Sequence, residues 1–264
     1  MISISSDVLQ AWISGFLWPL TRVLGLIATA PVFSHMAVPQ TVRLGLGVFI
    51  TLIIAPTIPN LPVVDLMSLQ GFLILVQQLI IGLAMGFTMR LVFTAVEMAG
   101  QISGLMMGLG FGSFYDPQSQ GQSIAVSQFF TIITMLLFLS IDGHLLLIMS
   151  ITESFMTLPI TIDPSGGLSV IKIVTWGGKI FSAGLHLSLP IIAALLMTNL
   201  ALGILNRSAP QLNLFGVGFP IMIGIGFVVI ALVLPRMAIP LEQLMHEGLN
   251  AVSQIATPAT SARP

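Results

Sequence analysis

The sequence predicts an all-α, multi-helix protein of the integral membrane type, and three observations lead to that prediction. The 264 residues are 56% hydrophobic and only 6% charged, and the mean hydropathy is +1.06. An ordinary soluble domain is about 25% charged. Apolar stretches of membrane-spanning length follow one another, without the regular ten-residue alternation of an outer-membrane barrel. Since folding hides only about three quarters of the surface of such a chain, its exterior must meet lipid or other protein.

The composition also limits the kind of chemistry that the chain supports. The net charge is −1 and no cluster of Lys or Arg occurs, so we expect no nucleic-acid partner. The absence of cysteine excludes disulfides, thiolate metal sites and thiol nucleophiles. Four histidines without HxxxH spacing give little support for a metal site, and HExxH, GxSxG and Walker motifs are absent. We therefore expect neither enzyme activity nor a metal or cofactor.

The first three apolar stretches differ in length. Residues 8–33 follow the candidate N-caps Ser6 and Asp7, and no basic residue precedes them, which favours a permanent segment over a cleaved signal. Residues 42–58 form a second stretch between short connectors that carry turn residues. Residues 71–115 contain no proline, and as one helix they would run about 65 Å, against a hydrocarbon core of about 30 Å.

The remaining stretches complete a count of six to eight crossings. Residues 124–151 are interrupted by Asp142-Gly143-His144, which fits either a proton relay or, preferably, helix caps at a short re-entrant turn. Residues 168–206 contain Pro190 and would reach nearly 60 Å as one helix, and residues 212–234 are the last stretch. Each overlong stretch either folds back as a hairpin or continues beyond the bilayer inside a protein assembly. We expect long broken helices and helical hairpins.

The C-terminal region has a different pattern. Apolar residues between 241 and 255 fall on one helical face and polar residues on the other. Pro240 suits the first turn of such a helix. We therefore expect a short amphipathic helix for a membrane surface or a partner, followed by a disordered tail at residues 257–264.

A strip of small residues marks one face of the third stretch. At 100° per residue the strip falls within an arc of roughly 80°, and small residues at four-residue spacing let helices approach closely in an apolar medium. Each charge in the strip would cost about 2.5–3.5 kcal/mol if it faced lipid at mid-depth. The strip predicts a packing face, either between subunits or within the chain alone. Its members are Gly82, Gly86, Arg90, Glu97, Gly100, Gly104 and Gly108.

The end of the third stretch is rich in glycine and reads GLMMGLGFGSFYDPQSQGQS from residue 104. Irregular backbone at membrane depth persists only inside protein or along a cavity, and methionine adapts to irregular gaps. The segment therefore fits a deformable plug over about residues 106–122, or else a helix end with a surface turn. The candidate sealing residues are Met106, Met107, Gly108, Gly110, Phe111, Gly112, Phe114 and Asp116.

A second segment, NLALGILNRSAPQLNLFGVGFP at residues 199–220, breaks two apolar helices at Arg207, Pro210 and Gln211. Taken alone it predicts an arginine-anchored loop. The segment resembles the FliR family, the flagellar subunit of the type III protein-export gate, whose pattern is close to NLALGxLNRxAPQxxxFxxGFP. Other parts of the chain match the family in the same order along the sequence. They are Arg22 with Pro31, the IGLAMGF and AVEMAGQ runs, Asp116-Pro117 and Gly143-His144. The resemblance covers nearly the whole chain, and injectisome homologues look similar.

This resemblance implies a non-enzymatic core subunit of an export gate in the bacterial inner membrane, within the flagellar basal body. The implied partners are FliP and FliQ in one hetero-oligomer, FlhB and FlhA nearby, exported flagellar proteins in the channel, and membrane lipid. Residues 1–165 would be a FliP-like part and residues 166–256 a FliQ-like part. The loop at residues 106–122 would be the pore plug, and much of the hydropathy would reflect subunit contact.

A second hypothesis is a stand-alone secondary transporter or ion channel with a polar site at Arg90, Glu97 and Asp142. Such transporters usually carry internal repeats with helices broken at matching positions. The sequence shows no convincing repeat, so the export gate is the leading hypothesis.

Overall fold

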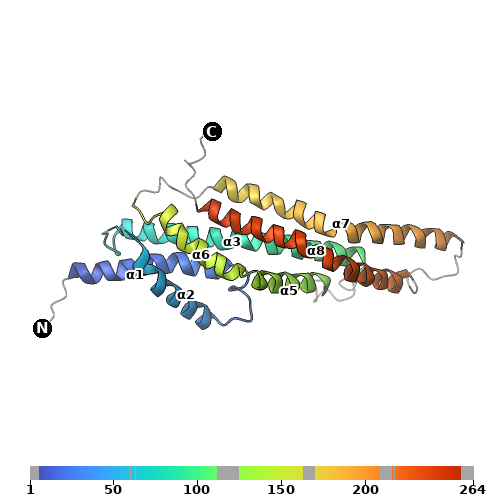
Figure 1. The fold of residues 1–264 in the computed structure, drawn as a ribbon, viewed down its shortest axis with the longest axis horizontal. Coiled ribbons are helices and arrows are strands. Elements are labelled where there is room, and N and C mark those ends of the chain that lie inside the picture. The colour runs from blue at the N-terminus through green and yellow to red at the C-terminus, as the bar shows by residue number, and fades with distance from the viewer. Residues whose placement is uncertain are drawn as a thin grey trace. The chain divides into compact units, whose positions relative to one another are not determined.

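The fold is all-α over the part of the chain that the computed structural model describes, which is residues 6–59, 61–62, 64–111, 125–162, 170–208, 216 and 218–256. No strand occurs among these residues, and the predicted fold class is confirmed. Two short 3-10 helices, η1 (Ala55–Thr57) and η2 (Leu109–Phe111), accompany the α-helices. In chain order the α-helices are α1 (Ser6–Thr29), α2 (Gln40–Ile54), α3 (Leu69–Met106), α5 (Ala125–Ser140), α6 (Gly143–Thr157), α7 (Val170–Ser208) and α8 (Phe219–Ile255) (Figure 1).

Five of these helices are long and apolar enough to cross a membrane, and the bent pair of α5 and α6 brings the number to six among the described residues. This reaches only the lower end of the six to eight crossings that hydropathy predicts. The difference arises because hydropathy counts 71–115 and 168–206 as stretches that could each cross twice. The structure instead shows one helix in each.

The overlong stretches do not fold back within the described residues. Helix α3 has 38 residues and α7 has 39, so each runs about 57–59 Å at 1.5 Å per residue. Pro190 lies inside α7 without ending it. Of the two alternatives left open by the sequence for these stretches, continuous helices that exceed the bilayer thickness are therefore the ones observed.

Helix α8 also corrects the prediction of a separate amphipathic helix that begins at Pro240. It runs unbroken for 37 residues through Pro235 and Pro240. Proline removes one backbone hydrogen bond, a loss that apolar helices tolerate when neighbouring groups compensate. The apolar face of the C-terminal part is buried within the chain, at Leu241, Met245 and Val252, and so is not free for a membrane surface.

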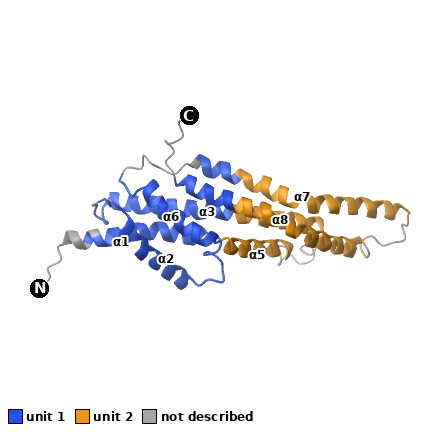
Figure 2. Cartoon of the chain, in the orientation of Figure 1, with its two compact units in different colours: residues 1–91, 142–177, 246–264 blue, residues 92–141, 178–245 orange. Residues whose placement is uncertain are grey.

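The chain divides into two compact units that alternate along the sequence (Figure 2). Unit 1 comprises residues 1–91, 142–177 and 246–264, and unit 2 comprises residues 92–141 and 178–245. Helices α3, α7 and α8 each contribute residues to both. These units coincide with neither 1–165 nor 166–256, because the long helices run through both of them. The FliP-like and FliQ-like division stays a prediction about resemblance.

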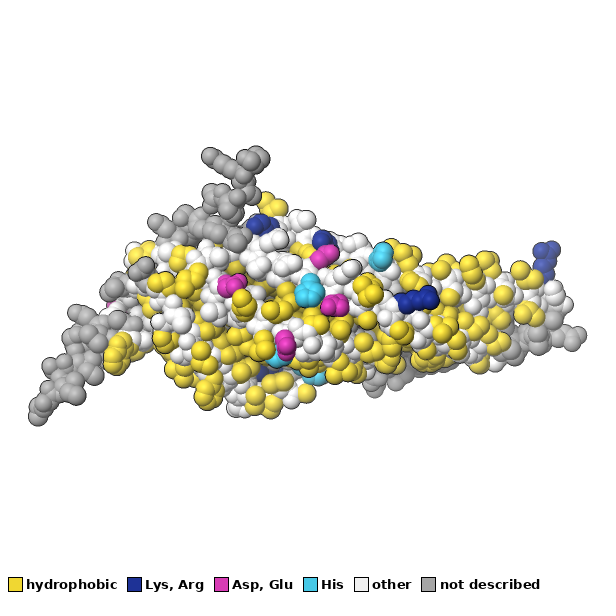
Figure 3. Space-filling model, viewed as in Figure 1, with side chains coloured by type: hydrophobic (Ala, Val, Ile, Leu, Met, Phe, Trp, Pro, Cys, Tyr) yellow, Lys and Arg dark blue, Asp and Glu magenta, His cyan; other side chains and the backbone are white. Residues whose placement is uncertain are grey.

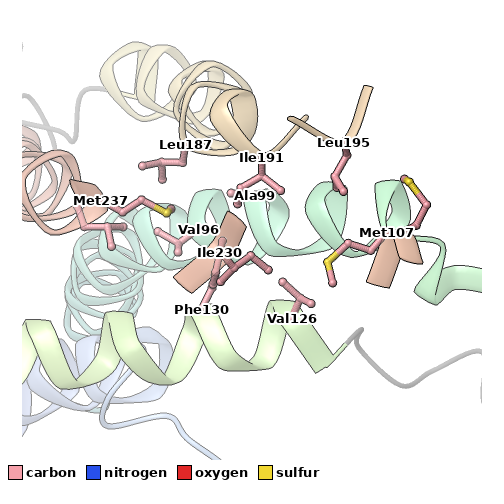
Figure 4. Packing of buried hydrophobic residues seen from close by; sticks show 12 residues of the cluster. Val96, Ala99, Met107, Val126, Phe130, Leu187, Ile191, Leu195, Ile230 and Met237 are labelled. Carbon is pink, nitrogen blue, oxygen red and sulfur yellow. The ribbon is translucent and has the colours of Figure 1, made fainter. Parts of the chain in front are cut away.

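Unit 2 is organised around one apolar cluster that α3, α5, α7 and α8 share (Figure 4). Its side chains are almost fully buried, and close van der Waals packing among them holds the four helices together. Helix α5 lies against α3 at Gly100, where a Cβ atom would come within 2.5 Å of the Ser127 Cα. The core includes Val96, Ala99, Met107, Val126, Phe130, Leu187, Ile191, Leu195, Ile230 and Met237.

Candidate functional site

Two places in the described residues concentrate unusual chemistry: a buried arginine in unit 1 and the end of α3 in unit 2. Arg22 is fully buried in the middle of α1, an apolar helix. A charge in such a segment is costly unless protein groups compensate it, so its partners identify an important contact. The sequence shows Arg22 as a lone charge in an apolar run, which is the signal that could have marked it as a site.

All three guanidinium nitrogens of Arg22 donate hydrogen bonds. Nε donates to Gln78 Oε1 at 2.7 Å, and Nη2 donates to the Leu158 carbonyl at 2.8 Å. Nη1 donates to the carbonyl of Ser154 at 2.9 Å and to its hydroxyl oxygen at 3.0 Å. The guanidinium carbon also lies 4.2 Å from the centroid of the Phe155 ring, within cation–π range. Arg22 therefore joins α1 to α3 and to the end of α6.

The end of α6 supplies the compensating negative charge. The C-terminal carbonyls of a helix lack partners within the helix and carry roughly half a negative charge between them. Helix α6 ends at Thr157, so the carbonyls of Ser154 and Leu158 are in its last turn and cap position. Arg22 is in effect the C-terminal cap of α6, supplied by another helix.

Glycines let α1 and α3 approach closely around Arg22. A Cβ atom on Gly82 would collide with the Arg22 carbonyl oxygen, and one on Gly86 with the Thr29 hydroxyl. Gly25 is equally restricted, since its Cβ would come within 2.9 Å of the Leu79 carbonyl oxygen. Gly82 and Gly86 of the predicted strip therefore pack within the chain, as Gly100 does against α5.

The other strip residues lie in different surroundings. Gly100 and Gly104 are buried in unit 2. Arg90 is exposed in unit 1 and Glu97 is half-buried in unit 2. Packing against other subunits stays a prediction for all of them.

The break between α5 and α6 is formed by backbone geometry. Asp142 has φ 55°, in the left-handed region, and its carbonyl accepts hydrogen bonds from the amides of Leu145 and Leu146. Asp142 is thus the N-cap residue of α6 through its backbone, and its exposed side chain makes no capping hydrogen bond. His144 is half-buried, and its Nδ1 has no hydrogen-bond partner.

Helix α3 ends in a turn that requires glycine. Gly108 has φ 84°, and its amide donates to the Leu105 carbonyl at 2.9 Å. Residues with a Cβ atom rarely adopt a positive φ, which is why glycine is common directly after the end of a helix. The 3-10 helix η2 follows directly, and residues 112–124 lie outside the described part.

The two methionines at this turn have different surroundings. Met107 is fully buried in the core of unit 2 and packs over Gly226, where a Cβ atom would come within 2.5 Å of its Cγ. Met106 is 39% exposed and lines an open apolar groove of about 410 Å³. The groove is formed by the end of α3, by α7 and by the start of α8, at Leu105, Met106, Met107, Gly108, Asn199, Leu202, Gly203, Gly218, Phe219 and Met222.

The remaining predicted residues are only partly described. Gly110 lies in η2, and nothing is described of the Phe111 side chain. Gly112, Phe114 and Asp116 lie outside the described residues, as do Pro210 and Gln211. Arg207 lies in the exposed last turn of α7. The sealing role stays a prediction, and of the predicted sealing residues whose side chains are described, Met106 lies at an open apolar surface.

Gly108→Ala should destabilise the end of α3 by about 1–3 kcal/mol, because alanine is strained at positive φ. Gly203→Ala is the matched control, since a Cβ atom there meets nothing within 4 Å. Thermal unfolding of the detergent-purified proteins would measure both. Equal midpoints for the two variants would contradict the left-handed turn.

Comparison with known proteins places the chain in a family. Residues 13–248 match the family described as bacterial export proteins, family 1. The chain is 43% identical over 262 residues to the flagellar biosynthetic protein FliR of Pectobacterium carotovorum subsp. carotovorum, covering 99% of this chain and 100% of the relative. It is 42% identical over 257 residues to the FliR of Escherichia coli (strain K12), with 97% of each chain covered. The FliR of Bacillus subtilis (strain 168) is 32% identical over 222 residues, which cover 81% of this chain and 84% of the relative. The chain therefore belongs to the FliR family of bacterial export proteins, as a helical membrane component of the flagellar export apparatus in the inner membrane.

Proposed function

We propose that the chain is a core subunit of the flagellar type III export gate. In this role it forms part of the channel through which unfolded export substrates cross the inner membrane, together with FliP and FliQ and beside FlhB and FlhA. The loop from residue 106 to residue 122 contributes the plug that closes the channel at rest.

The observation that carries this proposal is the length of exposed apolar surface on α7. Large exposed apolar side chains run from Ile171 to Leu205, a distance of about 51 Å along the helix. The hydrocarbon core covers only about 30 Å. The remaining roughly 20 Å of apolar helix surface needs protein neighbours, since contiguous apolar surface of this kind marks an interaction site. A subunit within a helical assembly supplies such neighbours, whereas a monomeric transporter does not.

Purification of the complete chain from native membranes in mild detergent tests the assembly. We expect FliP and FliQ to accompany the chain in a complex of fixed composition. A monodisperse preparation of the chain alone, competent for solute transport in vesicles, would instead support the transporter hypothesis with its site at Arg90, Glu97 and Asp142.

Deletion of residues 109–122 tests the plug separately. We expect the gate to assemble but to leak ions or small solutes, because the residues that close the channel are gone. The measurement is membrane permeability in cells that carry the deletion, with a variant that keeps the length of the loop but changes Pro117 to Ala as the control. Unchanged permeability in an assembled complex would remove the plug from the proposal.

A further inference from the structure

Two buried N–H groups in unit 1 have no hydrogen-bond acceptor among the described residues. They are Nε1 of Trp18 on α1 and Nε2 of Gln78 on α3, and both residues are fully buried. A buried donor without an acceptor is costly, and the great majority of buried polar groups in folded proteins have a protein or water partner. Two such donors in one unit therefore need an explanation.

The register of α1 against α3 follows from the glycine contacts. A Cβ atom on Gly82 would meet the Arg22 carbonyl, and one on Gly86 would meet the Ala30 amide nitrogen. Residue numbers thus increase together along the two helices. Residues that face each other differ in number by about 56–60.

This register places the two donors opposite each other. Trp18 lies one turn before Arg22 on the same buried face of α1. The offset puts Trp18 opposite the turn of α3 that ends at Gln78. The hydrogen bond from Arg22 Nε to Gln78 Oε1, at 2.7 Å, brings the amide to the same place. The indole and the amide therefore border one small region between α1 and α3, next to the guanidinium.

The Gln78 amide gains no partner by turning over. Arginine has five N–H donors and no acceptor, so the group that faces Arg22 Nε must be the amide oxygen. A reversed amide would set Nε2 against Nε, donor against donor. The hydrogen-bond pattern therefore assigns the amide orientation, and Nε2 is left as a donor that needs an acceptor elsewhere.

Outside water does not reach either donor. Trp18 and Gln78 both have a relative exposure of 0%, and α1 is a candidate membrane span from Trp12 to Thr29. The face of the molecule in Figure 3 is largely hydrophobic, with few and scattered charged side chains. An acceptor for the two N–H groups therefore has to be held inside unit 1.

We propose that unit 1 holds one internal water molecule, which accepts hydrogen bonds from Trp18 Nε1 and Gln78 Nε2. The oxygen of water has two lone pairs, which matches the two donors. Buried waters occur about once per 27 residues in globular proteins, and they sit where two to four polar groups meet. A halide ion fits less well, because the C-terminal carbonyls of α6 already oppose the charge of Arg22.

The water extends the contacts of Arg22 by one helical turn. Through Gln78 it connects the indole of Trp18 to the guanidinium, so that two successive turns of α1 are hydrogen-bonded to α3. The inference concerns unit 1 alone and does not depend on the channel role of the chain.

The three tryptophans of the chain provide a matched test. β-(3-Benzothienyl)alanine has the shape of tryptophan but carries sulfur in place of the indole N–H. Its site-specific incorporation at position 18 removes the donor and keeps the packing. Trp176 is the positive control, because its Nε1 donates to the Thr88 carbonyl at 3.2 Å. Trp12 is the negative control, because it is 68% exposed.

Thermal unfolding of the complete chain, with the subunits that purify with it, measures the effect. We expect the midpoint to fall by about 2–4 °C for the analogue at position 18 and at position 176, since each replacement removes one hydrogen bond. The analogue at position 12 should leave the midpoint unchanged. An unchanged or higher midpoint for position 18 would show that the Trp18 N–H has no acceptor, and it would overturn the proposal.

Electron cryomicroscopy of the same natural complex, at a resolution that shows ordered water, identifies the acceptor. We expect one density peak at about 2.7–3.2 Å from both Trp18 Nε1 and Gln78 Nε2. The peak should be equally strong in chloride and in bromide buffer. A stronger peak in bromide would identify a halide ion, and a map that shows other ordered waters but none here would leave the donors without a ligand. Either result contradicts the internal water.

Discussion

Gly82→Leu is expected to abolish accumulation of the folded chain. A Cβ atom at this position collides with the backbone carbonyl of Arg22, and a Cβ on the neighbouring Gly86 would lie 2.7 Å from the Leu26 carbonyl. Overpacking commonly costs about 1–3 kcal/mol when side chains can shift. Here the obstacle is the backbone of another helix, so α1 and α3 must separate and the cost should be greater.

Gly177→Leu is the matched control for this prediction. Gly177 lies within α7, and a Cβ atom there meets nothing within 4 Å. Leucine also favours helix more than glycine does, by up to about 1 kcal/mol. Gel filtration of fluorescent fusions in mild detergent would measure the folded fraction of each variant. Similar folded fractions for the two leucine variants would show that α1 and α3 do not cross closely at Gly82.

Arg22→Ala should cause the second large loss, about 3–5 kcal/mol of stability, the size expected for breaking a buried charged network. The substitution removes the Arg22 donor to the Leu158 carbonyl and one of the donors to the Ser154 carbonyl, and it opens a cavity in unit 1. Arg22→Lys should be intermediate, because one ammonium nitrogen cannot reach all the acceptors that three guanidinium nitrogens reach.

Thermal unfolding of the purified complex would measure these losses, with a decrease of roughly 10 °C in midpoint expected for the alanine variant. Arg236→Ala is the control, since Arg236 is exposed and a surface substitution usually changes stability by about 0.5 kcal/mol or less. If the unfolding midpoints of the alanine and lysine variants equal that of the Arg236→Ala control, Arg22 does not hold α6 in place.

The fold class and the candidate spans could be predicted from hydropathy, because apolar content decides which segments leave water. The continuity of α8 could not, since Pro235 and Pro240 are signals that normally end a helix, and the burial of Leu241 and Met245 beyond them depends on contacts that are not local in sequence. The same limit applies to α3. Its length could be calculated, but hydropathy does not distinguish one long helix from a hairpin, and the structure shows one helix that ends just before the left-handed Gly108.

The candidate site was predictable in part. Four-residue glycine spacing indicates close helix packing, and in the structure Gly82 and Gly86 of α3 pack against α1. Periodicity within one helix carries no information on which helix is the neighbour. Met106 and Met107 are adjacent and identical in type, yet Met106 is exposed and Met107 is buried, because consecutive side chains at the end of the helix point in different directions. The role of Arg22 depends on Leu158, 136 residues away, and no local pattern connects them.

The separation between Arg22 and Leu158 has a consequence for biogenesis. Ribosomes add about 5–20 residues per second, so the last acceptor for the Arg22 guanidinium, 136 residues later, is synthesised roughly 7–27 s after the arginine itself. During that interval the nascent first helix carries a charge in an apolar segment for which, of the acceptors named above, only Gln78 has been synthesised. We therefore expect its lateral release from the insertion machinery to be delayed until α6 emerges.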